Sequence, residues 1–194
     1  YLAAMRVRFA ARFDGEARVA LALDAPKKER LGLRSVAQFA GELEVEQVER
    51  LLPAIQYAWG LSTNDDRRAA LRALGGVRAS GLLAFLRRQC DNPEAPRDEV
   101  LAALAKSAAS EDYTRFLDGL SSPARETAEA CARALASIDR RPTTSDAFRM
   151  ALDLARRHGE KQGRAFLELF AVWSGEPIPA AEEDWEGTLA RYER

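Results

Sequence analysis

Hydrophobic and polar positions along this chain recur with the period of the α-helix. Leu2, Met5, Phe9 and Phe13, for example, lie three or four residues apart and so form one apolar stripe on a helix. No segment shows the strict alternation of apolar and polar residues that is typical of a half-buried strand. The pattern therefore predicts an all-α protein. The helices that we expect cover residues 1–13, 16–23, 31–40, 45–59, 65–74, 81–90, 97–104, 113–120, 123–138, 145–158, 163–173 and 184–192.

A helical hairpin recurs in the middle of the chain. The three segments that match one another are 67–74, 97–104 and 128–135, aligned on Leu74, Leu104 and Leu135, which are 30 and 31 residues apart. A second apolar helix follows each segment. A constant period of roughly 20 to 50 residues is typical of a solenoid, in which each unit buries its apolar face only against its neighbours. We therefore expect an α-solenoid of about five or six helical hairpins, that is, an α-α superhelix.

We expect this solenoid to form a single domain over residues 1–194. Irregular hairpins occupy 1–60, regular repeats occupy 61–158 and capping helices occupy 159–194. Residues that commonly cap the N-terminus of a helix stand at the expected starts, namely Thr63 or Asn64, Ser80, Ser110, Ser122 before Pro123, and Thr144 or Ser145. Glycines that commonly end helices stand at the expected ends, namely Gly15, Gly41, Gly60, Gly75 with Gly76, and Gly159.

Composition and charge narrow the class of protein. The 194 residues are 47% hydrophobic and 30% charged, which allows one sizeable core and is too polar for a membrane protein. No stretch of 18 or more apolar residues occurs, so we expect no membrane insertion. The net charge is −1, which does not favour a nucleic acid as the partner. The chain begins at Tyr1 and directly in a helical pattern, as a piece of a longer protein would, so the lack of a signal peptide does not indicate a location.

Residues that could carry catalysis or hold a metal are few. Nucleophilic catalysis needs a base, and the one histidine, His158, stands at a helix end where it can interact with terminal carbonyls. One histidine with Cys90 and Cys131 does not reach the ligand count of a zinc site, and no glycine-rich phosphate loop occurs. We therefore expect no catalytic residue, no metal and no cofactor. The two cysteines are interpreted as small apolar core residues, with a disulfide only if the chain is exported.

The surface offers more than one hypothesis of function. If the second helix of each hairpin lines the concave side of the solenoid, that side carries a set of charged residues. The candidate contact residues are Arg87, Arg88, Arg115, Asp118, Arg149, Asp153 and Arg156. The first hypothesis is a non-catalytic protein-protein interaction or scaffold module, whose partner is another protein or a neighbouring domain of the same chain. The alternative is a nucleic-acid-binding protein of the DNA-repair glycosylase type that uses the arginines on phosphates. The aspartates among them favour the first.

Residues 65–158 resemble HEAT repeats, with Ala-rich first helices, short Asp/Pro/Gly loops and second helices that carry Leu and Phe. Three further segments extend the resemblance, namely YLAAMRVRFAARFD, GLRSVAQFAGEL and AFLELFAVWSGE with DWEGTLARYER. With them the chain is similar to the HEAT region of large exported planctomycete proteins, which join a glucose-dehydrogenase-like propeller to a helical segment and a haem-binding c-type cytochrome domain. The resemblance implies an exported or periplasmic parent in which this piece is a spacer or docking platform. Because the chain has no C-x-x-C-H motif, haem attachment carries over to no residue here.

Overall fold

The computed structural model describes residues 15, 19, 32–177 and 190 of the chain. All regular elements in this part are helices, and no strand occurs in it, which confirms the all-α prediction. The predicted helices 1–13, 16–23 and 184–192 lie outside the described residues, except that Val19 and Ala190 are helical. Gly15 is also helical, which differs from the helix end predicted there. The chain divides into two compact units, Tyr1–Ser107 and Ala108–Arg194.

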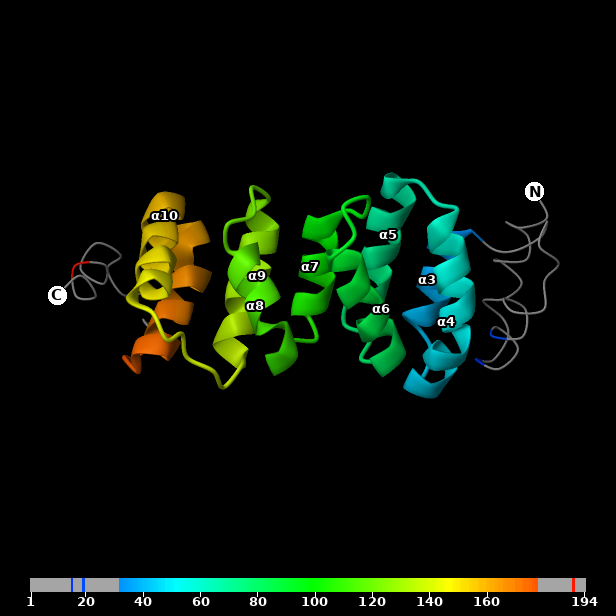
Figure 1. The fold of residues 1–194 in the computed structure, drawn as a ribbon, viewed down its shortest axis with the longest axis horizontal. Helices are drawn as coiled ribbons and strands as arrows, with labels where there is room; N and C mark the ends of the chain where they lie inside the picture. The colour runs from blue at the N-terminus through cyan, green and yellow to red at the C-terminus, as the bar shows by residue number, and fades with distance from the viewer. Residues whose placement is uncertain (1–14, 16–18, 20–31, 178–189, 191–194) are drawn as a thin grey trace. The chain divides into compact units, whose positions relative to one another are not determined.

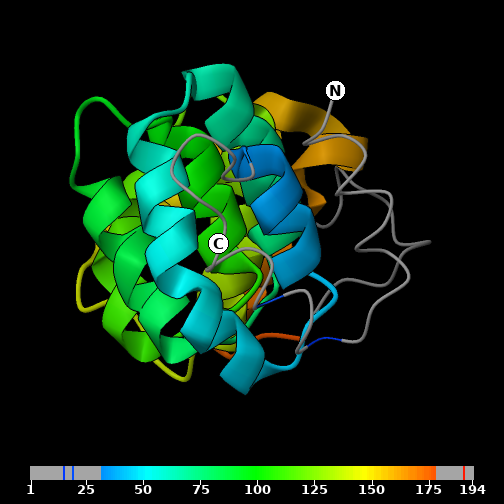
Figure 2. The ribbon, with the colours of Figure 1, turned by 90° about the vertical axis from the view of Figure 1, so that its right-hand side faces the viewer.

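The described helices of the first unit pack in two rows. They are α3 (Leu33–Ala40), α4 (Val45–Gly60), α5 (Asn64–Leu74), α6 (Ser80–Cys90) and α7 (Arg97–Ala105). α5 packs against both α3 and α7 to form one row, and α4 packs against α6 to form the other (Figure 1). Contacts of α3 with α4 and of α6 with α7 join the rows, and Figure 2 shows α3 and α4 side by side. Neighbours within a row are therefore separated by one other helix in the sequence.

The second unit begins with a short 3₁₀-helix and continues with three longer elements. They are η2 (Ser110–Asp112), α8 (Tyr113–Gly119), α9 (Arg125–Ser137) and α10 (Ser145–Ser174). α9 packs against α8 and against α10. The core of this unit thus forms around α9, which is buried along one side by its two neighbours.

α10 is a helical hairpin and not one continuous helix. At Gly159 the backbone has φ 69° and ψ 177°, a combination that is essentially restricted to glycine. The chain reverses there, so that the ring of Phe148 lies 5.9 Å from that of Trp173. The two segments approach so closely that a Cβ atom at Gly163 would clash with the carbonyl oxygen of Ala155. The sequence correctly predicted two helices here, divided at Gly159.

The leucines on which the three matching segments align are core residues. The exposed fraction of the residue is 1% for Leu74, 0% for Leu104 and 0% for Leu135, and each leucine stands in the last turn of its helix. Full burial of a leucine contributes about 1.5–3 kcal/mol relative to exposure. Cys90 and Cys131 are also buried, as free thiols, in agreement with their interpretation as small core residues.

Two predicted caps have different outcomes in the first unit. Thr63 caps α5 as predicted, because its Oγ1 accepts a hydrogen bond of 3.3 Å from the backbone N–H of Asp66. Ser80 is not the cap of α6 but its first residue. Its hydroxyl instead donates to Oε1 of Glu49 on α4, at 3.0 Å. The sequence alone could not show this partner, because it comes from another helix.

The predicted starts of helices in the second unit also need correction. Ser110 does not cap α8 but begins η2, the 3₁₀ turn that precedes it. Ser122 forms a tight turn in which its Oγ accepts a hydrogen bond of 3.0 Å from the backbone N–H of Ala124. As a consequence α9 begins at Arg125, two residues later than the predicted start at Pro123.

Candidate functional site

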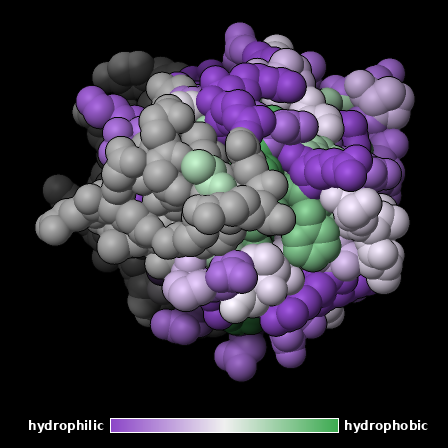
Figure 3. Space-filling model, turned by 90° about the vertical axis from the view of Figure 1, so that its left-hand side faces the viewer, coloured by the Kyte–Doolittle hydropathy of each residue, from purple (hydrophilic) through white to green (hydrophobic). Residues whose placement is uncertain are grey.

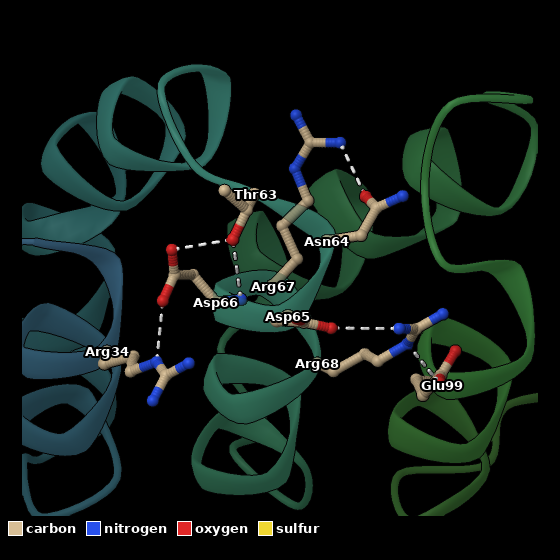
Figure 4. A network of polar contacts seen from close by, with 8 residues as sticks. All are labelled: Arg34, Thr63, Asn64, Asp65, Asp66, Arg67, Arg68 and Glu99. Atoms are coloured by element: carbon tan, nitrogen blue, oxygen red, sulfur yellow. Dashed lines mark hydrogen bonds and ion pairs between the residues drawn. The ribbon is translucent and has the colours of Figure 1, made fainter.

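The beginning of α5 carries a network of polar contacts that reaches both of its neighbours in the row (Figure 4). On the α3 side, Arg34 donates from Nε to Oδ1 of Asp66 at 2.7 Å. The other carboxylate oxygen of Asp66 accepts a hydrogen bond from Oγ1 of Thr63 at 2.8 Å. One carboxylate thus joins the start of its own helix to the preceding helix of the row.

The same kind of contact recurs one step further along the row. Arg68 on α5 donates from Nε to Oε1 of Glu99 on α7 at 2.7 Å. Its Nη1 also contacts Oδ1 of Asp65 at 3.1 Å (Figure 4). Glu99, like Asp66, is the third residue of its helix, where the positive end of the helix dipole favours a carboxylate. We call Arg34–Asp66 and Arg68–Glu99 the row ion pairs.

The second row of this unit has a polar contact with a similar spacing. Glu49 on α4 accepts hydrogen bonds at Oε1 from the hydroxyl of Ser80 and, at 2.8 Å, from the backbone N–H of Gly81. These two residues begin α6, so the carboxylate satisfies an N–H group that the helix itself leaves without an acceptor. Glu49 therefore replaces the cap that the sequence of α6 lacks.

Arg67 joins three segments of the first unit. Its Nε and Nη2 both donate to the carbonyl oxygen of Trp59 at the end of α4, each at 3.2 Å. Its Nη1 donates to Oδ1 of Asn64 at 3.1 Å and to the carbonyl oxygen of Glu94, before α7, at 3.2 Å. The guanidinium also lies 5.4 Å from the centre of the Trp59 ring, within range of a cation–π contact. This side chain fixes how α4, α5 and the loop before α7 meet.

The ionised form of Asp66 is favoured by its surroundings. The hydrogen bond from Thr63, and then the Arg34 guanidinium, hold the pKa of Asp66 below its usual value of 3.8. Both partners act on the charged form of the carboxylate, which is the form that can bind Arg34. The row ion pair therefore persists over the whole neutral range of pH.

A groove of about 340 Å³ opens in the second unit, between the end of α8 and the first segment of α10. It is lined by Leu120, Ser121, Asp146, Arg149, Met150, Asp153, Leu154 and Arg157. Its base is apolar, since Leu120 and Leu154 are buried. The four charged residues of its lining are all exposed. The groove is thus open to water and charged along its edge.

Two of the candidate contact residues lie in this groove. Arg149 and Asp153 line it, and Arg156 stands beside it, with Nη1 3.6 Å from Oδ1 of Asp153. Asp146 and Arg157, which are not among the seven candidate contact residues, complete the charged edge. Their spacing along the helix was the available signal, because residues at i, i+3, i+7 and i+11 share one face.

The other candidate contact residues do not line the groove. Arg87 and Arg88 belong to the last turn of α6 in the first unit, where Arg88 is exposed and Arg87 is half-buried. Arg115 on α8 has Nη1 3.6 Å from Oδ1 of Asp112, a fully buried carboxylate, so its position is set by the core. Asp118 on α8 is exposed. Whether these four residues contact a partner stays a prediction.

Hydrophobic side chains also reach the surface on α10. Phe148, Leu152 and Phe170 are half-buried. Figure 3 views the molecule from its α10 end and shows hydrophobic atoms among hydrophilic ones. The ring of His158 stacks on the buried Phe166, with 5.4 Å between ring centres.

Two classes of site are missing from the part of the chain that the structure describes. No three His, Cys, Asp or Glu side chains gather there as a metal site would require. None of the helices in residues 32–177 combines the length and the apolar composition needed to cross a membrane.

Comparisons with protein-family models, with curated proteins and with solved structures found no match to this chain.

Proposed function

We propose that this chain is a non-catalytic protein-protein interaction or scaffold module, built as an α-solenoid of HEAT-like hairpins. The observation that carries the proposal is the recurrence of the row ion pairs, Arg34–Asp66 and Arg68–Glu99, at successive steps of one row. Equivalent contacts at successive steps are expected when each hairpin packs on the preceding one as a repeat. Repeats of this kind form extended surfaces, and such surfaces bind other proteins.

The groove on α10 supports a protein as the partner. Sites for small molecules are mostly apolar and enclose their ligand, whereas this groove has four exposed charged residues above a small apolar base. Charges of both signs at the edge of an apolar surface are typical of protein interfaces, where they fix the partner and its register.

The same groove argues against the nucleic-acid alternative. Along the helix, Asp146 precedes Arg149, and Asp153 lies between Arg149 and Arg157. The two aspartates would repel the phosphates that the arginines attract. The whole chain has 29 basic and 30 acidic residues and offers no excess of positive charge. A protein partner therefore fits the described charges better than DNA or RNA does.

The partner in this proposal is another protein or a neighbouring domain of the same polypeptide. The resemblance to the HEAT region of exported planctomycete proteins favours the second case. There the module would hold a propeller and a c-type cytochrome domain at a fixed separation, outside the cytoplasm. Any electron transfer would then belong to the neighbouring domains.

Site-specific photo-crosslinking in the full chain tests the proposal. Benzoylphenylalanine is placed at Arg149 in the groove, at Arg88 on α6, and at Arg72 as the control, an exposed residue of α5. The labelled chains are irradiated in an extract of the source cells, and mass spectrometry identifies the adducts. In parallel, fluorescence anisotropy measures binding to duplex DNA at low and high salt.

The proposal predicts adducts to one protein, or one domain type, from Arg149 or Arg88 and not from Arg72. The purified partner must then bind the unlabelled chain in calorimetry. Equal adducts from all three positions, or no adducts at all, would contradict the proposal. Tight, salt-sensitive binding of DNA would favour the nucleic-acid alternative. An adduct to a second copy of this chain does not count for this proposal.

A further inference from the structure

The first segment of α10 presents a stripe of alternating charge along the groove. The stripe consists of Asp146, Arg149, Asp153 and Arg157, at spacings of three, four and four residues. At 3.6 residues per turn these positions fall within about 80° of the helix circumference, so all four project to the same side. We call this set the α10 charge stripe.

The α10 charge stripe is complementary to itself when reversed. Halfway between Asp146 and Arg157 is position 151.5, and halfway between Arg149 and Asp153 is position 151. Both pairs of opposite charge are thus centred on nearly the same point of the helix. A two-fold axis through that point would place each charge of one copy opposite its counterpart in an antiparallel second copy, as an isologous interface requires.

We propose that the groove side of α10 is a homodimer interface, in which two copies of this chain pack their α10 charge stripes antiparallel about a two-fold axis. Asp146 of each copy faces Arg157 of the second copy, and Arg149 of each copy faces Asp153 of the second copy. The two unique contacts therefore give four ion pairs across the interface.

The apolar lining of the groove is centred on the same axis. Met150 and Leu154 have their midpoint at position 152, and both lie in the groove together with Leu120. Met150 is half-buried, and its Sδ lies 3.9 Å from Oγ of Ser121. A methionine adapts its shape to a partner more readily than a branched side chain does. Met150 thus offers an accessible apolar contact among the charges, whereas Leu120 and Leu154 are buried in the core of the chain itself.

The charges of the stripe are available for contacts between copies. Asp146, Arg149 and Arg157 form no ion pair with another residue in the part of the chain that the structure describes. Asp153 has a loose contact of 3.6 Å with Arg156, and both side chains are more than half exposed. Such a pair contributes little on its own and can be exchanged for a pair across the interface.

A second copy accounts for the stripe better than an unrelated peptide does. A foreign ligand requires only that its own charges match, so it places no condition on the midpoints of Asp146–Arg157 and Arg149–Asp153. A symmetric dimer requires those midpoints to coincide, and they differ by half a residue. The inference goes beyond the proposed function and stands without it, because it assigns the groove to a second copy of this chain and leaves Arg88 on α6 as the candidate contact of a different partner.

Charge exchange between copies tests the dimer. Sedimentation velocity of the full chain is measured over rising concentration, at low and high salt, for the wild type and for R149E, D153R and the double variant R149D/D153R. The variant R72E is the control, because it makes the same charge change at an exposed site on α5, in the other unit. All substituted positions are exposed, so circular dichroism is expected to show an unchanged fold.

We expect the wild type and R72E to dimerise alike, with a dissociation constant that rises at high salt. In R149E a carboxylate faces Asp153 of the second copy, and in D153R a guanidinium faces Arg149, so each single variant loses about tenfold or more in affinity. An equimolar mixture of R149E and D153R dimerises again, because the two introduced charges face each other. R149D/D153R also dimerises, since its stripe is still self-complementary.

The results that overturn the proposal are equally specific. A wild type that stays monomeric over the whole concentration range contradicts it. So does a dimer that R149E leaves intact, or a mixture of R149E and D153R that does not associate. If the wild type does not dimerise and benzoylphenylalanine at position 149 crosslinks to a different protein, the groove belongs to that protein.

Discussion

Arg68 on α5 and Glu99 on α7 form an ion pair with 2.7 Å between Nε and Oε1, and this pair repeats the contact that Arg34 makes with Asp66 one step earlier. The two arginines are 34 residues apart and the two carboxylates are 33 residues apart. This spacing is close to the period of 30 and 31 residues between the aligned leucines. The spacings of the ion-pair residues and of the aligned leucines differ by two to four residues.

The Arg68–Glu99 pair is expected to make a small contribution to stability. Its side chains are 45% and 39% exposed, and exposed pairs contribute about 0.2–1 kcal/mol. A double-mutant cycle of R68A, E99A and R68A/E99A, measured by urea unfolding, should give a coupling free energy of about 0.5 kcal/mol. The coupling should fall at high salt. A coupling of zero at low salt would show that the pair does not hold α5 against α7.

Replacing Arg67 is expected to cost more than replacing Arg68. Arg67 is half-buried and donates hydrogen bonds to the carbonyl oxygens of Trp59 and Glu94. Replacing Arg67 with alanine would leave both oxygens without this donor. Because hydrogen bonds from charged groups contribute about 1.5–3 kcal/mol, R67A should lower the free energy of unfolding by that amount. R67K keeps the charge but not the planar fork, so it should recover only part of the loss. Urea unfolding of R67A, R67K and R72A checks the order, and an R67A no less stable than R72A would contradict it.

The contribution of Asp66 to stability should depend on pH. Its pKa in the folded chain is lowered from the usual 3.8, first by the hydrogen bond from Thr63 and then by Arg34. A lowered pKa stabilises the folded state above pH 3.8, and this stabilisation is lost as the pH falls below 3.8 through the folded pKa. The difference in urea midpoint between the wild type and D66N should therefore be full at neutral pH and shrink in acid. A difference that does not change with pH would contradict the lowered pKa.

A substitution at Gly159 tests the turn in α10. No atom lies within 4 Å of the position that a Cβ would take at Gly159. Any loss of stability in G159A therefore comes from the strain of holding alanine at a φ of 69°. We expect a loss of about 1–3 kcal/mol in the free energy of unfolding. The control is G60A, at the last residue of α4, where space is also open and φ is not positive. G60A should be neutral or stabilise by up to about 1 kcal/mol. Equal effects of G159A and G60A would contradict the hairpin.

Local patterns were sufficient to predict most of the helices. The periodicity of apolar residues, the Thr63 cap and the break at Gly159 all depend on a few consecutive residues, and the structure confirms them. The start of α6 could not be predicted, because its capping carboxylate, Glu49, comes from another helix. The start of α9 was placed at Pro123, since the sequence does not show that Ser122 forms a turn.

The candidate site was only partly predictable for the same reason. Arg149 and Asp153 were selected as charged residues of a second helix that was expected to line the concave side of a solenoid, and they line the groove. The apolar base of the groove depends on Leu120, at the end of a different helix. Tertiary packing determines which helix end contacts α10, and the pattern of residues within one helix does not predict that contact.

The central claim is that hairpins stack in a row, with α5 between α3 and α7. Electron paramagnetic resonance tests it most directly, with spin labels on cysteines introduced in pairs at Gln38, Arg72 and Lys106, which are exposed and 34 residues apart. Cys90 and Cys131 are buried and should react slowly. Helices that pack side by side are about 8–10 Å apart, so the account predicts short, similar distances for Gln38–Arg72 and Arg72–Lys106, and about twice that distance for Gln38–Lys106. A distance between Gln38 and Lys106 no longer than the other two would contradict it.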